Sequence, residues 1–521
     1  MTIFKSPLAD VALRDISITE RMFEGLAGDP DRVVLIDGPS GATMTGATLR
    51  DRIQRLAAGL TTRGFGAGQV VAILAPNMPD YATVFHGVAY AGGTITTINP
   101  TYTASEVRHQ LKDAGASLVV TIPAFLQTVQ AAIADLPQVQ GVITIGQVSS
   151  NASIDDWMAD MPQAAQVPVD LDRHILVLPY SSGTTGLPKG VMLSHRNLVV
   201  NVDQVIICAD VRRADTSIAF LPFFHIYGMT ALMNAFLSTG GCLVTMPRFD
   251  LEGVLTHIQT HKVRLMMVAP PVAIALTKHP MVDQFDLSSL QVLFSAAAPL
   301  GPEVSQACSV RLNCVIVQGY GMTELSPLSH AVPHRAPKLG SVGPTVPNSQ
   351  TRIVDPVSGT NQGPGQEGEV WVRGPQVMLG YLNNLEATAK TMEGDWLKTG
   401  DLGMMDEDGY LFIRDRLKEL IKVKGFQVAP AEVEGELLGL PGVADAAVIG
   451  VPDDEAGEVP MAFVVSTAGA SQDVATIQAA LRKRLASYKV PTRIEFIDAI
   501  PKSAAGKILR RVLRDRVKGQ S

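Results

Sequence analysis

The sequence predicts an α/β protein with a large N-terminal α/β domain and a small C-terminal α+β domain. Short apolar runs at residues 69–74, 117–121, 141–145 and 174–179 alternate with helix-length segments, which is typical of parallel β-α-β units covered on both faces. A chain of 521 residues is also too long for one hydrophobic core. A separate pattern of strands and a helix begins beyond residues 415–418, where we place the domain boundary.

The composition excludes several classes of protein. Hydrophobic residues make up 46% and charged residues 18% of the chain, as in ordinary globular proteins. The net charge of −7 argues against a nucleic-acid binder. The four cysteines form no C-x-x-C pair, which indicates a reducing compartment. No signal peptide, peroxisomal tripeptide or bilayer-spanning run is evident, so we expect a cytoplasmic protein without a transmembrane segment.

The first elements of the N-terminal domain carry ordinary start signals. The apolar run 69–74 is expected to be a buried strand, and a helix is expected to follow Pro79. Thr103 and Glu106 have the spacing of a capping box, which predicts a helix start there.

A glycine-rich loop is the feature around which the rest of the chain is organised. The segment YSSGTTGLPKG, residues 180–190, follows the strand predicted at 174–179. Its glycines, hydroxyl groups and single lysine, Lys189, can surround a phosphate chain. It is not a Walker A loop, because Lys189 is followed by Gly190 and Val191 rather than by Ser or Thr. A solvent-exposed turn is the alternative interpretation.

Two further strands run directly into loops of small residues. The run 291–294 leads into SAAAPLG at 295–301, and 314–317 leads into QGYGMTE at 318–324. Because ligands bind at the carboxyl ends of strands in open α/β sheets, both loops and the glycine-rich loop are expected to border one crevice. There, Tyr320 offers a ring for stacking and Glu324 a hard oxygen for Mg²⁺.

Three other features allow both a structural and a functional interpretation. His225 lies in LPFFHIYG at 221–228, and a histidine among aromatic residues is usually a core residue. Asp401 lies in the segment TGD, where an aspartate usually caps the local backbone of a turn. The basic tail at 501–511 contains Lys507, and taken alone it is a solvated arm. A separate pair, His257 and His261, is four residues apart and could share a helix face. Because no third ligand for a metal is evident, we interpret them as surface or core histidines.

In their order along the chain, these motifs resemble those of the adenylate-forming enzymes, which include acyl-CoA synthetases, 4-coumarate–CoA ligases, luciferases and peptide-synthetase adenylation domains. The resemblance implies a multi-sheet N-terminal domain at residues 1–414, a hinge at 415–418 with Lys418 as its pivot, and a mobile C-terminal domain at 419–521. It also implies ATP and CoA as co-substrates, Mg²⁺ as cofactor and a small carboxylic acid as substrate.

The resemblance assigns roles to individual residues. Catalytic roles fall on Lys507, Lys189, His225, Thr323 and Glu324, with Glu324 also the metal ligand. The residues expected to contact ATP or AMP are Ser181, Ser182, Gly183, Thr184, Thr185, Gly186, Ala297, Ala298, Pro299, Gln318, Gly319, Tyr320, Gly321, Met322, Asp401, Arg416, Lys422 and Gln427. The expected acyl pocket comprises His225, Ile226, Tyr227, Ala231, Ser295, Ala296, Ala297, Gly319, Gly321, Pro327 and Leu328. CoA is expected to contact Lys424, Gly425 and Phe426.

The implied reaction is a two-step ligation through an acyl-adenylate, with release of pyrophosphate and then AMP. The branch most similar is that of the 4-coumarate–CoA ligases, but LSPL at 325–328 and SAAAP at 295–299 depart from the plant pattern beside the acyl pocket. An aryl-propenoic acid and a medium- or long-chain fatty acid therefore both remain as substrates. Alternatives are a carrier-protein-loading enzyme, a luciferase-like oxygenase and a non-catalytic nucleotide-binding module. The sequence leaves the oligomeric state open, a homodimer included.

Overall fold

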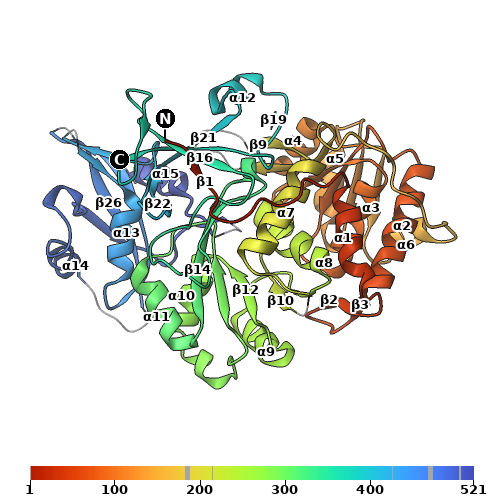
Figure 1. The fold of residues 1–521 in the computed structure, drawn as a ribbon, viewed down its shortest axis with the longest axis horizontal. Helices are drawn as coiled ribbons and strands as arrows, with labels where there is room; N and C mark the ends of the chain where they lie inside the picture. The colour runs from red at the N-terminus through yellow and green to blue at the C-terminus, as the bar shows by residue number, and fades with distance from the viewer. Residues whose placement is uncertain are drawn as a thin grey trace.

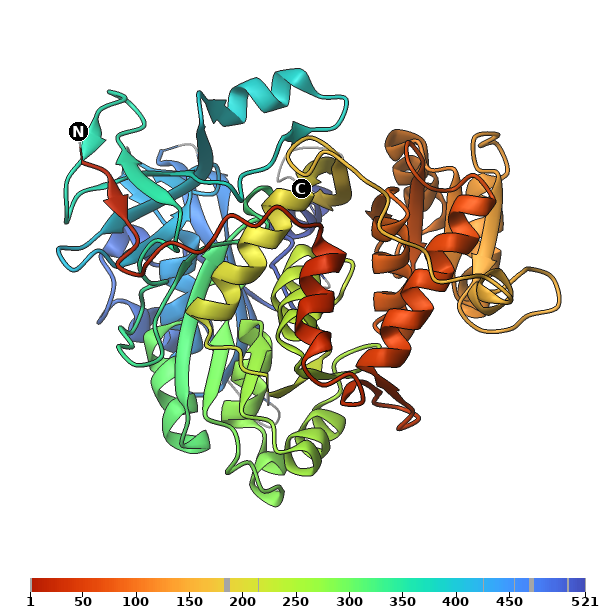
Figure 2. The same cartoon turned by 45° about the vertical axis from the view of Figure 1, so that its right-hand side comes forward.

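The computed structural model describes residues 2–181, 188–213, 215–424, 426–453, 455–467, 473–503 and 506–520. They form an α/β protein with a large N-terminal part and a smaller C-terminal domain, as the sequence predicts. In Figures 1 and 2 the sheet of the first third of the chain, coloured red to orange, lies at one side of the molecule, and the blue C-terminal domain lies at the other.

The first sheet of the large domain contains the predicted parallel strands. Its order is β19-β9-β8-β5-β4-β6-β7, with β4, β5, β6, β7 and β8 parallel and the β8–β9 and β9–β19 pairs antiparallel. The strands are β4 (Val70–Leu74), β5 (Thr94–Thr97), β6 (Leu118–Thr121), β7 (Gly141–Thr144), β8 (Ile175–Ser181), β9 (Lys189–Ser194) and β19 (Gly380–Tyr381).

Helices cover both faces of this sheet. Alternate residues of β4 point to opposite sides, so that Val71 and Ile73 belong to the main core, whereas Ala72 and Leu74 pack in a separate cluster with the next helices. The predicted capping box is present: Thr103 and Glu106 cap α4 reciprocally. The helices of this region are α1 (Ile18–Ala27), α2 (Gly46–Thr62), α3 (Pro79–Tyr90), α4 (Ala104–Ala114), α5 (Leu126–Ile133) and α6 (Ile154–Met158).

Two four-stranded sheets form the middle of the chain. One has the order β10-β11-β2-β3 and the other β12-β13-β14-β15, in which only the β14–β15 pair is antiparallel. The strands are β2 (Val33–Asp37), β3 (Thr43–Thr45), β10 (Thr216–Ala219), β11 (Cys242–Thr245), β12 (Leu265–Val268), β13 (Val292–Ser295), β14 (Val315–Gly321) and β15 (Leu328–Ala331). The helices are α7 (His195–Cys208), the π-helix η2 (Tyr227–Asn234), α8 (Ala235–Thr239), α9 (Leu251–His261), α10 (Pro270–Lys278) and α11 (Pro302–Leu312).

An antiparallel sheet completes the large domain. Its path is β1-β16-β18-β21-β20, with β17 paired to β16 and β22 to β21. The elements are β1 (Phe4–Lys5), β16 (Gln350–Val354), β17 (Asn361–Gln362), β18 (Glu367–Arg373), α12 (Leu385–Thr391), β20 (Met392–Glu393), β21 (Trp396–Met405) and β22 (Leu411–Arg416).

The C-terminal domain has a sheet and a core of its own. The sheet order is β24-β23-β26-β25, with β27 beside β26. Its elements are β23 (Ile421–Val423), β24 (Phe426–Val428), α13 (Pro430–Leu438), β25 (Val443–Asp453), β26 (Gly457–Ser466), α14 (Val474–Leu481), β27 (Arg493–Phe496) and α15 (Arg510–Gln520). The main core of the large domain ends with Leu411 and this second core begins with Ile421, one on each side of the predicted hinge.

Two segments expected to be loops or turns are strands. Residues 318–321 continue β14, because they pair with β15. Asp401 lies within the ten-residue strand β21, between β18 and β22, rather than in a turn. Within the described part of the chain, no helix is long and apolar enough to cross a bilayer.

Candidate active site

The glycine-rich loop connects two paired strands. β8 ends at Ser181 and β9 begins at Lys189, and these two residues are paired across the hairpin. Gly190 lies against the Tyr180 ring, since a Cβ at this position would be 3.2 Å from ring atoms. The predicted ATP contacts that lie outside the described residues are Ser182, Gly183, Thr184, Thr185 and Gly186.

Glu324 lies in the short 3₁₀-helix η4 (Thr323–Leu325), which one residue, Met322, separates from the end of β14 at Gly321. Its side chain is buried, and Oε1 accepts hydrogen bonds from the Tyr381 hydroxyl at 2.8 Å and from Ser181 Oγ at 3.4 Å. The Glu324 carboxylate, which follows β14 of one sheet, therefore contacts the β8–β9 hairpin of another sheet. This is the convergence of strand ends that the sequence predicts.

A second cluster surrounds Asp401. One carboxylate oxygen accepts from the Tyr320 hydroxyl at 2.5 Å, and the other lies 3.1 Å from Arg416 Nε. Burial and the charge of Asp401 hold the pKa of Tyr320 well above its ordinary value, so the phenol stays protonated and donates. Asp401 raises the pKa of Arg416 in turn. Asp401 is thus a buried anion with one cation and one neutral donor.

Lys507 reaches this cluster from the C-terminal domain. The preceding Gly506, with a φ of +82°, lies against Ala269 and Pro271 of the large domain. Burial, followed by the nearby charge of Arg416, lowers the pKa of Lys507 to about 8, although Asp401 and Glu419 act in the opposite direction. The ammonium group is therefore half-buried among charges of both signs.

His225 borders the same space. Burial and the charge of Lys507 lower its pKa to about 4, so the imidazole is neutral at pH 7. The backbone N–H of Tyr227 lies 3.3 Å from Nδ1. Because Nδ1 accepts this bond, the ring proton is assigned to Nε2, and His225 can donate a hydrogen bond without carrying a charge.

Two of the predicted acyl-pocket residues, Tyr227 and Gly319, contact Phe294. Tyr227 begins the π-helix η2, and its hydroxyl donates to the carbonyl of Phe294 at 3.1 Å. Gly319 lies against the Phe294 ring and Leu328, and a Cβ there would be 2.6 Å from the ring. Gly321 lies against Pro327, whose carbonyl oxygen would be 1.9 Å from an added Cβ. The two glycines therefore allow β14 to approach its neighbours closely.

The loop after β13 is fixed against β14. The Gln318 side chain accepts from the N–H of Leu300 at 3.0 Å, and Ala297 adopts a φ of +76°. Ala296, Ala298 and Pro299 follow the end of β13 at Ser295. The buried Ser295 Oγ has no hydrogen-bond partner within the described part of the chain.

The segment expected to contact CoA lies exposed in this structure. Lys424 is exposed and Phe426 is 58% exposed, and so are Lys422 and Gln427, which were predicted to contact the nucleotide. Phe426 stacks on Tyr488 of the same domain, with ring centroids 4.8 Å apart. Gly425 lies outside the described residues, and Lys418 is exposed in the turn that follows β22.

The residues present fit a magnesium ion bound together with nucleotide phosphates. Glu324 offers a hard oxygen, and the described residues contain no group of three or more His, Cys, Asp or Glu side chains that could enclose a metal. Mg²⁺ commonly takes one or two carboxylates and completes its octahedron with phosphates and water. A single buried carboxylate beside a phosphate loop meets that requirement.

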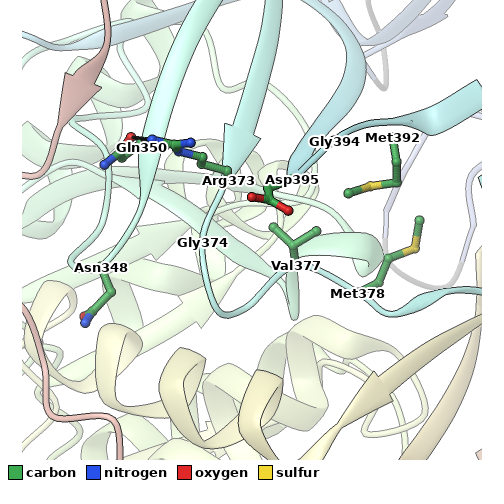
Figure 3. Close-up of a pocket in the computed structure, with 9 residues that line it drawn as sticks. All are labelled: Asn348, Gln350, Arg373, Gly374, Val377, Met378, Met392, Gly394 and Asp395. Atoms are coloured by element: carbon green, nitrogen blue, oxygen red, sulfur yellow. Dashed lines mark hydrogen bonds between the residues drawn. The ribbon is translucent and has the colours of Figure 1, made fainter. Parts of the chain in front are cut away.

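A cavity elsewhere on the large domain does not belong to this cluster. Its volume is about 500 Å³, and Figure 3 shows its nine lining residues, among them Arg373, Asp395 and Met378. None of the nine is a predicted site residue. Met378 links the two regions, since its N–H donates to the carbonyl of Glu324 at 3.0 Å.

Sequence reasoning missed Tyr381. The segment GYLN at 380–383 carries no recognisable chemistry, and its distance of more than fifty positions from Glu324 in the chain hides the contact. Only the pairing of β19 with β9 brings it to the site. In the sequence, the aromatic residue directly after Gly380 was the sole available signal.

The fold and this cluster define an adenylate-forming enzyme. Residues 22–382 match the AMP-binding enzyme family and residues 432–507 match the AMP-binding enzyme C-terminal domain. The chain belongs to this family, as its motifs predicted. It is 41% identical over 528 residues to 4-coumarate–CoA ligase 5 of Oryza sativa subsp. japonica, covering 99% of this chain and 97% of that one. It is 39% identical over 528 residues to 4-coumarate–CoA ligase 1 of Petroselinum crispum, with 99% and 97% covered.

Solved structures of similar proteins share the whole fold. ATP-bound MatB of Rhodopseudomonas palustris matches with a TM-score of 0.88 and 31% identity, covering 96% of this chain and 99% of that one. The anthranilate–CoA ligase AuaEII in complex with anthranoyl-AMP matches with a TM-score of 0.91 and 27% identity, covering 97% and 98%. The AMP-forming acid–thiol ligases are therefore the class of enzyme to which this protein is similar throughout its length.

Proposed function

We propose that this protein is an ATP-dependent carboxylate–CoA ligase that acts through an acyl-adenylate. The observation that carries the proposal is the meeting of Lys507, from one domain, with Asp401, Arg416 and His225 of the other. A buried cation delivered by a second domain is suited to a reaction between two anions, since charge neutralisation and positioning are what that reaction needs.

In the first step, a carboxylate oxygen attacks the α-phosphorus of ATP and pyrophosphate departs. Lys507 neutralises the incoming carboxylate and the α-phosphate, while Lys189 and the hydroxyl loop hold the departing pyrophosphate. Asp401 accepts from the ribose hydroxyls, with Arg416 beside it and Tyr320 against the base. When bound to Glu324, Mg²⁺ supplies positive charge to the phosphates. Thr323, the first residue of η4, contacts the α-phosphate.

In the second step, the CoA thiol attacks the acyl carbonyl and AMP departs. Lys424 and Phe426 are exposed in the present arrangement, so we infer a rotation of residues 419–521 about Lys418. Lys507 then leaves the site and the segment around Gly425 enters it. Re-use of one site by a moving lid is an accepted type of conformational step.

For the acid, we propose an aryl-propenoic acid of the 4-coumarate type or a medium- or long-chain fatty acid. The apolar surroundings of Phe294, Tyr227 and Leu328 and the names of the relatives support this choice. We also propose a cytoplasmic location, because the four cysteines are free thiols. A homodimer is a further proposal, to be tested by light scattering.

The deciding measurement is pyrophosphate release from Mg·ATP with cinnamates, benzoates and C4–C16 fatty acids, with and without CoA. We expect release that depends on one class of acid and rises when CoA is added. Pyrophosphate release that CoA does not accelerate would indicate that another acceptor takes the place of CoA. No release with any acid would contradict the ligase assignment in favour of a nucleotide-binding module.

A further inference from the structure

Backbone pairing with β9 holds Tyr381 beside the β8–β9 hairpin. β19 pairs with β9 so that Tyr381 faces Val191, and the bonds continue on both sides, from Leu379 N–H to the Met192 carbonyl at 2.9 Å and from Leu382 N–H to the Gly190 carbonyl at 2.8 Å. The side chain is 7% exposed. Its position is thus fixed by main-chain contacts to the strand that begins with Lys189.

The Tyr381 hydroxyl makes the shorter of the two hydrogen bonds to the Glu324 carboxylate. It donates to Oε1 at 2.8 Å, whereas Ser181 Oγ lies 3.4 Å away, at the limit of a hydrogen bond. The backbone of Glu324 is held by the same segment, because Met378 N–H donates to its carbonyl. One short stretch, residues 378–381, therefore fixes both the main chain and the carboxylate of the expected metal ligand.

The Tyr381 ring lies under the Lys189 ammonium group. Nζ is 5.0 Å from the ring centroid, within the range of a cation–π contact. In the described part of the chain, no carboxylate lies within 4.0 Å of Lys189. The ring therefore places the lysine without neutralising it, and its full charge stays available for phosphate.

We propose that Tyr381 is a positioning residue for adenylation, with two separable roles. Its hydroxyl orients the Glu324 carboxylate toward Mg²⁺, and its ring orients Lys189 toward the nucleotide phosphates. A hydrogen-bonding partner of this kind fixes a metal ligand in its productive rotamer, and losing it commonly costs about 10- to 100-fold in metal affinity. The proposal rests on the ligase function proposed above.

Tyr381→Phe tests the hydroxyl alone, because the ring stays. We expect weaker binding of Mn²⁺ in the presence of ATP, by about tenfold, when free Mn²⁺ is counted by electron paramagnetic resonance. The Mg²⁺ concentration for half-maximal pyrophosphate release should rise by a similar factor. The KM for the acid and thioester formation from supplied acyl-adenylate should not change, since neither uses this ion.

Tyr381→Leu tests the ring. We expect the Mn²⁺ defect of the phenylalanine variant and, in addition, weaker binding of ATP measured without a divalent cation. If both variants bind metal-free ATP equally well, the ring has no role in placing Lys189.

Tyr410 supplies a matched control outside the site. Its hydroxyl donates to the Ala336 carbonyl at 3.1 Å, and Lys338 Nζ lies 5.0 Å from its ring. Tyr410→Phe and Tyr410→Leu therefore remove the same two kinds of contact at a distance from Glu324. We expect neither to alter Mn²⁺ or ATP binding.

An equal effect of the Tyr381→Phe and Tyr410→Phe variants on Mn²⁺ binding would overturn the proposal. A fall in melting temperature of Tyr381→Phe with unchanged Mn²⁺ binding would do so as well, leaving Tyr381 with a purely structural role. Because nucleotide and metal binding are measured without turnover, these outcomes are distinct from a failure of the ligase assignment, which the acid panel on the wild type decides.

Discussion

At the scale of single residues, Lys507 stands out because the proposed function needs its charge where burial opposes that charge. Its pKa is lowered from 10.5 to about 8, first by burial and then by Arg416. A lowered pKa means that the ammonium group loses its proton earlier as the pH rises. The charge proposed for catalysis is therefore present below pH 8 and disappears above it.

We expect kcat/KM for adenylation to fall as the pH rises through about 8, since this quantity reports groups of the free enzyme. Lys507→Arg should keep its charge at higher pH and move this limb in the alkaline direction, at the cost of a lower maximum. A pH profile of pyrophosphate release checks this. An unchanged limb in the arginine variant would assign the ionisation to another group.

Removing the Lys507 charge should separate the two half-reactions. We expect Lys507→Ala to reduce adenylation by about 100-fold or more, the size of a lost charge-stabilising group, and to retain thioester formation from supplied acyl-adenylate. The two steps are measured separately by pyrophosphate release and by AMP release. Equal losses in both steps would contradict the division of labour between two domain positions.

At the scale of elements, helices α3 and α7 bury neutral histidines. His86 and His195 have pKa values lowered to about 3, chiefly by burial, and His174 stacks on His195 at 5.6 Å. Thr19 Oγ1 and the Ile18 N–H are the hydrogen-bonding groups that face them. These pKa values lie below the unfolded value, so the unfolded chain binds more protons between pH 6.5 and 3.

Stability of the large domain should therefore fall as the pH drops below 6.5. At pH 5 each histidine should cost about 2 kcal/mol, from the 1.36 kcal/mol that one pKa unit represents. Urea unfolding at pH 7 and pH 5 measures this. His86→Gln should flatten the dependence, and a slope equal to that of the wild type would exclude His86 as a cause.

The sequence predicts those elements that carry an apolar run or a capping signal. The parallel strands β4, β6, β7 and β8 and the capped start of α4 lie where the apolar runs and the Thr103–Glu106 spacing place them. Residues 318–321 and Asp401 were assigned to loops or turns, although they lie in strands that pair with β15 and β18. Small and polar residues in such strands leave no local periodicity to detect.

The same distinction applies to the site. Tyr320, Glu324 and Asp401 were predicted from motifs and are found together through the meeting of separate sheets. Tyr381 could not be predicted, because its role depends on a two-residue strand that pairs across nearly two hundred positions. Motifs identify groups that react, whereas the residues that orient them become visible only in three dimensions.

At the scale of the whole molecule, the position of the small domain depends on a few contacts with the large one. Lys278 on α10 donates to the Val443 carbonyl at 3.0 Å, close to Asp445, which is ion-paired with Lys502. This places the tail that carries Lys507 over the site. On the proposed function, this contact belongs to the adenylation arrangement, in which Lys507 is in place.

We expect Lys278→Ala to lower the adenylation rate by about three- to tenfold, which lies within the net contribution of about 0.5–1.5 kcal/mol of a typical hydrogen bond, and to leave thioester formation from acyl-adenylate intact. Lys262→Ala is the control, because it removes an exposed ammonium that pairs with Asp286 inside the large domain. A Lys278 variant with both steps equally slow would show that the contact serves stability rather than domain position.

The two hydrophobic cores, which end at Leu411 and begin again at Ile421, also bear on how such enzymes diversify. On the proposed function, the acid pocket is built in one core and the reactive lysine is carried by the other, with a single passage of the chain between them. Lys278 reaches across to a main-chain carbonyl, an acceptor that every sequence provides. Inheritance can therefore exchange or reshape the half that selects the acid while the half that delivers the charge stays as it is, and new substrates can be acquired without reinventing the chemistry.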